Sequence, residues 1–206
     1  SGLAIPFDAA LFCTIESICD SDTYDIAGIK PRTVIHESLR VPSIVEIIAL
    51  RYASSGRYNL FSKIINENFN VDIIEDRRLM ERNFGEFEGK TAEELKDDPD
   101  FKDWLMGGED AGAPFGETNG EFRERVCKCF KNTVDGILKT ENRSVSIITH
   151  GGVIMTLMAV YGFPQAKPFE WACDSGTGYS IRVTPMLWQR DKVSEVYRTI
   201  PVEIED

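Results

Sequence analysis

The stretch SVSIITHGGVIMTLMAVY, residues 144–161, decides the fold. Its first six residues form an apolar run with little polar alternation, which predicts a strand buried on both faces. After His150-Gly151-Gly152, apolar side chains recur at helical spacing, at Val153, Leu157, Met158 and Tyr161. His150 is therefore expected at the carboxyl end of a strand, next to the first free amides of a helix, where the helix dipole favours an anion. A capped histidine in an ordinary turn is the simpler interpretation, but the double glycine and the strand-end position favour an anion site formed by His150 and Gly151.

The composition excludes several classes of protein. The 206 residues suit one domain, residues 1–206, with no internal repeat and no low-complexity linker. The net charge of −11 argues against a nucleic-acid partner and against an anionic membrane surface, and no stretch reaches membrane-spanning length. The five cysteines are an odd number without metal-type spacing, and the chain has only two histidines. We therefore expect no metal site, no organic cofactor and a reducing, cytoplasmic setting.

Strand-like and helix-like segments alternate along the chain. Strands are predicted at 9–14, 44–52, 71–74, 144–149, 178–183 and 193–200, although the short run at 44–52 is also compatible with a helix. Helices are predicted at 31–39 and 57–68, from the capping box that begins at Thr91, and from Thr118 to Lys139. This alternation predicts a three-layer α/β/α sandwich with a mostly parallel sheet. The segment 97–117, which is rich in glycine, is expected to be a mobile surface excursion that serves as a cap or specificity segment.

Two further stretches could carry chemistry. Arg57 begins a helix just after a strand, in RYNLFSKII, where its guanidinium could grip a phosphate, although a solvated surface arginine is the simpler interpretation. The loop LMERNFGEFEG, residues 79–89, interleaves charges with phenylalanine and glycine, which indicates a loop that is held in place. Glu81 in this loop could act as a general acid near apolar walls. Gly116-Glu117-Thr118 is interpreted as no more than a helix cap.

Taken together, these stretches resemble the histidine phosphatase superfamily, in its phosphoglycerate-mutase-like branch. LMERNFGEFEG resembles the family's acid-bearing loop, ITHGG its second-histidine motif, GETNGEFRERV its Gly-Glu-Ser/Thr helix start, and RYNLFSKII its arginine-led helix. The resemblance implies that Arg57 binds phosphate, that Glu81 is the general acid and that His150 is the second histidine. In this family, a first histidine in an Arg-His-Gly-Glu-Ser/Thr run at the end of strand one accepts the phosphoryl group.

The first motif of that family is degenerate in this chain. It falls on CTIES, residues 13–17, so that Cys13 stands at the arginine position and Thr14 at the position of the nucleophile. Asp20 falls where a phosphate-contacting asparagine commonly stands. In this register the pocket loses a cation and gains a carboxylate, and Thr14 cannot form a phosphohistidine.

Neither of two other residues replaces the missing nucleophile. His36 lies too close in sequence to Arg57 for the strand, loop, helix and strand that must intervene. Cys13 lacks the arginine that closes the phosphate loop of a cysteine phosphatase, since position 19 is also a cysteine.

The resemblance therefore implies a degenerate member of the family, with little or no phosphohistidine chemistry, that acts as a phosphate-binding or regulatory domain. The alternative is an active phosphomonoesterase with a non-standard first motif; a phosphoglycerate mutase is less expected in so compact a chain. A third possibility is that Glu81 and His150 serve packing alone. The expected ligand is phosphate or a small phosphorylated metabolite, and a second copy of the chain or an active relative is a possible partner.

Overall fold

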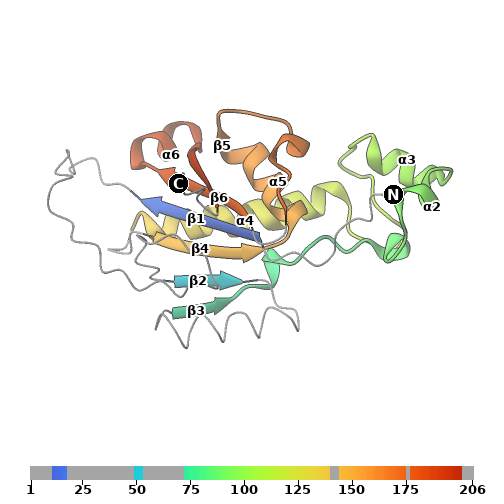
Figure 1. The fold of residues 1–206 in the computed structure, drawn as a ribbon, viewed down its shortest axis with the longest axis horizontal. Helices are drawn as coiled ribbons and strands as arrows, with labels where there is room; N and C mark the ends of the chain where they lie inside the picture. Colours follow the sequence, from blue (N-terminus) through green and yellow to red (C-terminus); the bar gives the residue numbers. More distant parts are fainter. Residues whose placement is uncertain (1–10, 18–48, 53–71, 140–143, 175–176, 201–206) are drawn as a thin grey trace, which may run out of the picture.

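The computed structural model describes residues 11–17, 49–52, 72–139, 144–174 and 177–200 (Figure 1). The strands form one sheet in the order β3-β2-β4-β1-β6-β7-β5. They are β1 (Leu11–Ser17), β2 (Ala49–Tyr52), β3 (Asp72–Glu75), β4 (Ser144–Thr149), β5 (Gly162–Phe163), β6 (Gly178–Val183) and β7 (Ser194–Ile200). The α-helices are α2 (Ala92–Leu95), α3 (Pro99–Leu105), α4 (Asn119–Ile137), α5 (Gly151–Tyr161) and α6 (Pro185–Asp191). Short 3₁₀ turns are η1 (Arg77–Leu79), η2 (Gly85–Phe87) and η3 (Pro168–Trp171).

The sheet is mixed: the described strands include antiparallel pairs besides the parallel ones that the sequence predicted. The strands β3, β2 and β4 are parallel to one another, as expected for a βαβ-type half. In contrast, β1 runs antiparallel to β4 and parallel to β6, and β7 runs antiparallel to β6. The apolar pattern of a buried strand is the same in either direction, so the sequence could not distinguish the two arrangements.

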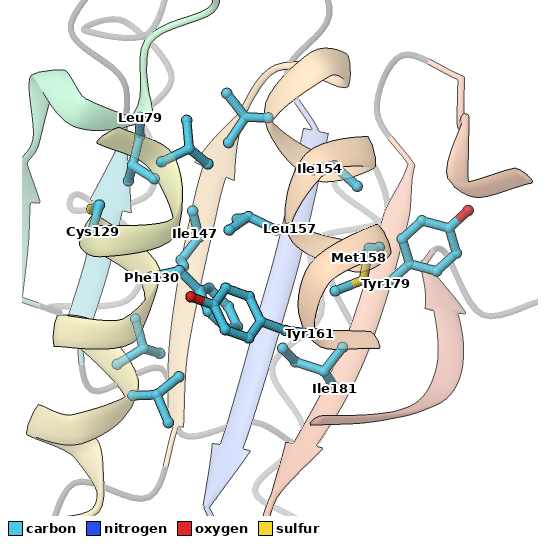
Figure 2. Close-up of a cluster of buried hydrophobic side chains, with 14 of the residues drawn as sticks. Leu79, Cys129, Phe130, Ile147, Ile154, Leu157, Met158, Tyr161, Tyr179 and Ile181 are labelled. Atoms are coloured by element: carbon cyan, nitrogen blue, oxygen red, sulfur yellow. The ribbon is translucent and has the colours of Figure 1, made fainter. Parts of the chain in front are cut away.

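The main apolar core lies between the sheet and the helices α4 and α5, which lie side by side over one face of it (Figure 2). The stripe on α4 and the apolar face of α5 meet at Phe130 and Tyr161, whose rings stack with centroids 4.9 Å apart. Trp188 of α6 closes the same cluster, 5.4 Å from the Tyr161 ring. The helices predicted at 31–39 and 57–68, which would form the third layer, lie outside the described residues.

The structure confirms the positions of several predicted strands and helices and the caps of two helices. The strand at 144–149, the strand at 178–183 and the helix that follows His150 have the predicted positions. The side chain of Thr118 accepts a hydrogen bond from the Glu121 amide, and Thr91 and Glu94 form the predicted capping box. Helix α6 was not predicted, although Thr184 as N-cap and Pro185 at the first position are its typical start signals.

A second, smaller apolar cluster forms apart from the main core and includes part of the segment 97–117. It contains Phe84, Phe87, Leu95 and Phe101, with Trp104 and Ala113 packed against it. The segment 97–117 is therefore partly helical and shares a core with the acid-bearing loop. We call residues 84–117 the cap (Figure 1). No helix within the described part of the chain has the length and apolar character needed to cross a membrane.

Candidate functional site

The turn from β4 into α5 has the geometry that the sequence predicted. His150 is the N-cap of α5 in an extended conformation, and its carbonyl accepts the Ile154 amide at 3.0 Å. The residue is buried, with 8% of its surface exposed, and the preceding Thr149 is fully buried. Because α5 begins at Gly151, the positive end of the helix dipole lies at this histidine.

The acid-bearing loop reaches this turn through Glu81. One carboxylate oxygen of Glu81 accepts the Gly152 amide at 2.9 Å, and the other accepts the Arg82 amide at 2.9 Å. A β-carbon at position 152 would lie 2.5 Å from the nearer oxygen of Glu81, so the glycine permits this approach. The structure thus brings the predicted acid and the predicted histidine turn together.

The backbone just before Glu81 is bonded to the same turn. The Thr149 hydroxyl donates to the Leu79 carbonyl at 2.6 Å, and Nδ1 of His150 lies 3.3 Å from the same oxygen. Leu79 itself is fully buried in the main core (Figure 2). The loop is therefore held in place, as the phenylalanine and glycine residues between its charged residues indicated.

Arg125 and Glu117 complete the site and were not recognised from the sequence. Arg125 donates from Nε and Nη2 to the two carboxylate oxygens of Glu117, each at 2.7 Å. Its Nη1 also donates to the carbonyls of Arg78 and Met80, at 2.8 and 3.0 Å. Glu117 is thus more than part of a helix cap. Glu117 directly precedes the N-cap Thr118 and Arg125 lies eight residues further on, inside α4, so no helical spacing in the sequence indicated this pair.

Arg82, the residue after Glu81, joins the acid-bearing loop to helices α3 and α4. The guanidinium of Arg82 lies 4.5 Å from the Phe122 ring centroid and 5.6 Å from that of Trp104. It also donates to the side-chain oxygen of Asn119. Burial lowers the pKa of Arg82 from its ordinary value, against the opposing effect of the nearby Glu81. Arg82 remains a cation at neutral pH, and its charge partly balances the acidic side chains around it.

The residues onto which the resemblance places the first motif are not brought to His150. Leu11 is the residue of β1 that lies opposite Thr149, whereas Cys13 lies opposite Ile147 and Thr14 opposite Ser146. At a rise of about 3.3 Å per residue, Thr14 is roughly 10 Å along the sheet from Thr149. The expected pairing of Thr14 with His150 is therefore not found, because β1 runs antiparallel to β4. Arg57 and Asp20 lie outside the described residues.

The start of α5 has features that favour an anion. It combines a helix N-terminus and a buried histidine with one carboxylate that is already bonded to two backbone amides. Among the described residues, no group of three or more histidine, cysteine, aspartate or glutamate side chains could hold a metal ion.

Comparisons with known proteins show similarity in sequence and in fold. The family model "Histidine phosphatase superfamily (branch 1)" matches residues 49–195. The "Putative phosphoserine phosphatase 2" of Hydrogenobacter thermophilus is 27% identical over 146 residues, which cover 68% of this chain and 66% of that protein, just under two thirds of its length.

Two solved structures share the fold. YhfR of Bacillus stearothermophilus superimposes with a TM-score of 0.59 at 23% identity, over 91% of this chain and 95% of YhfR. The alpha-ribazole phosphatase of Shigella flexneri gives a TM-score of 0.62 at 15% identity, over 95% of this chain and all of that one (100%).

Proposed function

Since the chain belongs to the histidine phosphatase superfamily, we propose that it is a phosphate-binding member that has lost the phosphohistidine step and acts as a binding or regulatory domain. The observation that carries this proposal is the histidine content. The chain has two histidines, of which His150 lies at the start of α5 and His36 precedes the region matched by the family. No histidine occurs in β1, the strand onto which the resemblance places the nucleophile.

What the chain retains supports a role in binding. The family match includes Arg57, Glu81 and His150, the residues that the resemblance assigns to the phosphate cradle and to the acid. The start of α5 supplies a positive dipole end to a ligand phosphate, while the Glu81 carboxylate and the net charge of −11 oppose it. We therefore expect inorganic phosphate to bind weakly, with a dissociation constant on the order of millimolar.

The experiment combines turnover and binding. We expect the wild-type protein to hydrolyse an aryl phosphate no faster than the background rate, and to bind inorganic phosphate weakly by calorimetry. His150→Ala should abolish that binding, whereas Lys102→Ala on the exposed face of α3 should leave it unchanged. Turnover well above background that His150→Ala abolishes would overturn the proposal. Submicromolar phosphate binding would contradict the expectation that Asp20 faces the site.

The second candidate is an active phosphomonoesterase. It is favoured by the position of Glu81, whose carboxylate lies one hydrogen bond from the start of α5, where a general acid would stand beside a bound phosphate ester. The name of the curated relative suggests phosphoserine as the first ester to assay. Hydrolysis of phosphoserine that is lost in both Glu81→Gln and His150→Ala would establish this candidate.

A further inference from the structure

The backbone of residues 78–81 is held on both of its sides. Arg125 of α4 donates to the carbonyls of Arg78 and Met80, and its Nη2 lies 3.5 Å from the carbonyl of Glu81. The intervening carbonyl of Leu79 is held by the Thr149 hydroxyl of β4. Each carbonyl of the segment thus has a donor, and the donors come from two different elements of the main core.

The arginine is itself fixed by a partner. Glu117 receives two of its N–H groups in the planar, two-pronged geometry that a guanidinium forms with a carboxylate. The two side chains are only 24% and 16% exposed, so solvent screens the ion pair less than a surface pair. Five donor groups in a rigid plane allow one arginine to hold a carboxylate and a run of carbonyls together, which a lysine ammonium cannot do.

The bonds that hold the 78–81 backbone also fix the position of the Glu81 side chain. Glu81 must place one oxygen on the Gly152 amide and the other on the Arg82 amide, in a space so narrow that a β-carbon at position 152 would touch it. A shift of the 78–81 backbone by a fraction of an ångström would break the Gly152 hydrogen bond, since hydrogen bonds weaken steeply with distance and angle.

We propose that Arg125, oriented by Glu117, is a positioning residue that sets the Glu81 carboxylate against the Gly152 amide at the start of α5. This inference rests on the proposed function, because that amide is part of the site offered to phosphate. It assigns the Gly116-Glu117-Thr118 helix start a role in building the site in addition to capping α4. It also gives a reason for the ion pair of Glu117 with Arg125, which contacts the loop.

The test is the amide resonance of Gly152 in a proton–nitrogen NMR spectrum of the full chain. Glu81→Gln supplies the reference position of an amide that has lost its carboxylate acceptor. In Arg125→Lys we expect the Gly152 amide proton to move upfield, towards that reference. The matched control is Arg123→Lys on the same helix, whose guanidinium pairs with the exposed Glu109 instead, and it should leave the Gly152 resonance in place.

A folded Arg125→Lys protein with an unshifted Gly152 resonance would overturn the inference. If Arg125→Lys does not fold, Glu117→Gln is the second test, because it removes the charge of the carboxylate and keeps one acceptor for Arg125. A smaller upfield shift of the Gly152 amide proton is then expected, and no shift would overturn the inference. The readout is independent of the proposed function. Absence of phosphate binding by the wild-type protein would remove the function and leave the positioning result standing.

Discussion

At the scale of single residues, Gly152 at the candidate site and Gly85 in the cap show two different needs for glycine. Gly152 gives room to a side chain, since the atoms nearest to a β-carbon there would be those of the flexible Glu81 carboxylate. Gly85 gives room to backbone: its φ is +47°, and a β-carbon would lie 2.1 Å from the Pro114 carbonyl oxygen. The first contact can be relieved by rotation of a side chain, and the second cannot.

We therefore expect the two alanine substitutions to differ in their effect on the free energy of unfolding. In Gly152→Ala, the loss of one hydrogen bond, about 1 kcal/mol, is offset by the better helix propensity of alanine, also about 1 kcal/mol. The free energy of unfolding should thus change by less than about 1 kcal/mol. Gly85→Ala should cost more than about 2 kcal/mol, because left-handed backbone and a backbone clash add together. Urea unfolding of the two variants measures both changes, and equal losses would contradict this distinction.

The Glu81 carboxylate has a further consequence for any ligand. It already occupies the Gly152 amide at the positive end of the α5 dipole, so a phosphate that approaches His150 meets a resident negative charge. Binding of a phosphate to this amide must displace the carboxylate from it. This residue alone can therefore make a helix N-terminus a weak phosphate site, whatever else the cradle retains.

At the scale of elements, the direction of β1 is the point on which the structure differs from the family resemblance. The resemblance expects Thr14 near His150, whereas the structure does not place it there. An antiparallel pairing with β4 places Thr14 directly opposite Ser146, whereas a parallel first strand would carry Thr14 towards the β4–α5 turn. Opposite residues in an antiparallel pair have β-carbons about 4.5–5.5 Å apart, close enough for a disulfide after a small adjustment.

Cysteine pairs test this direction. In a Cys13→Ser background, which removes the adjacent thiol, Thr14→Cys with Ser146→Cys should form a disulfide under mild oxidation, seen as a mobility shift that a reductant reverses. The comparison pair, Thr14→Cys with Thr149→Cys, should remain reduced, because its positions are roughly 10 Å apart along the sheet. Cross-linking of the second pair instead of the first would show that β1 runs parallel to β4 and would bring position 14 back to the site.

The elements that could be predicted are those defined by local pattern. The β4–α5 turn, the caps at Thr91 and Thr118 and the held acid loop follow from residues that are close in sequence. What escaped prediction depends on distant partners. The bonds from Arg125 to the loop join residues 44 to 47 positions apart, and the direction of β1 is decided by which strand it meets. The local sequence around Arg125 or around β1 does not indicate which distant residues or strand it will meet.

At the scale of the whole molecule, the cap and the main core meet around one partly buried cation. The Arg82 guanidinium lies between the Trp104 ring of the cap and the Phe122 ring of α4. Asn119, which accepts from Arg82, donates in turn to the Gly108 carbonyl at 2.9 Å. Arg82 also follows Glu81 directly, so the contact that docks the cap is adjacent to the candidate acid. A substitution that changes how the cap docks is therefore expected to affect the site through this residue.

We predict that Arg82→Met loosens the cap while the main core stays closed. Methionine keeps an apolar stem between the two rings but loses the charge and the hydrogen bond to Asn119, a cost of roughly 1.5–3 kcal/mol. Amide hydrogen exchange should therefore become about ten- to a hundredfold faster in α3 and stay unchanged in α5. Lys102→Met removes the same charge from an exposed position on α3 and should leave both helices unaffected. Equal acceleration in α3 and α5 would mean that Arg82 supports the whole fold, and no acceleration in α3 would mean that the cap docks without it.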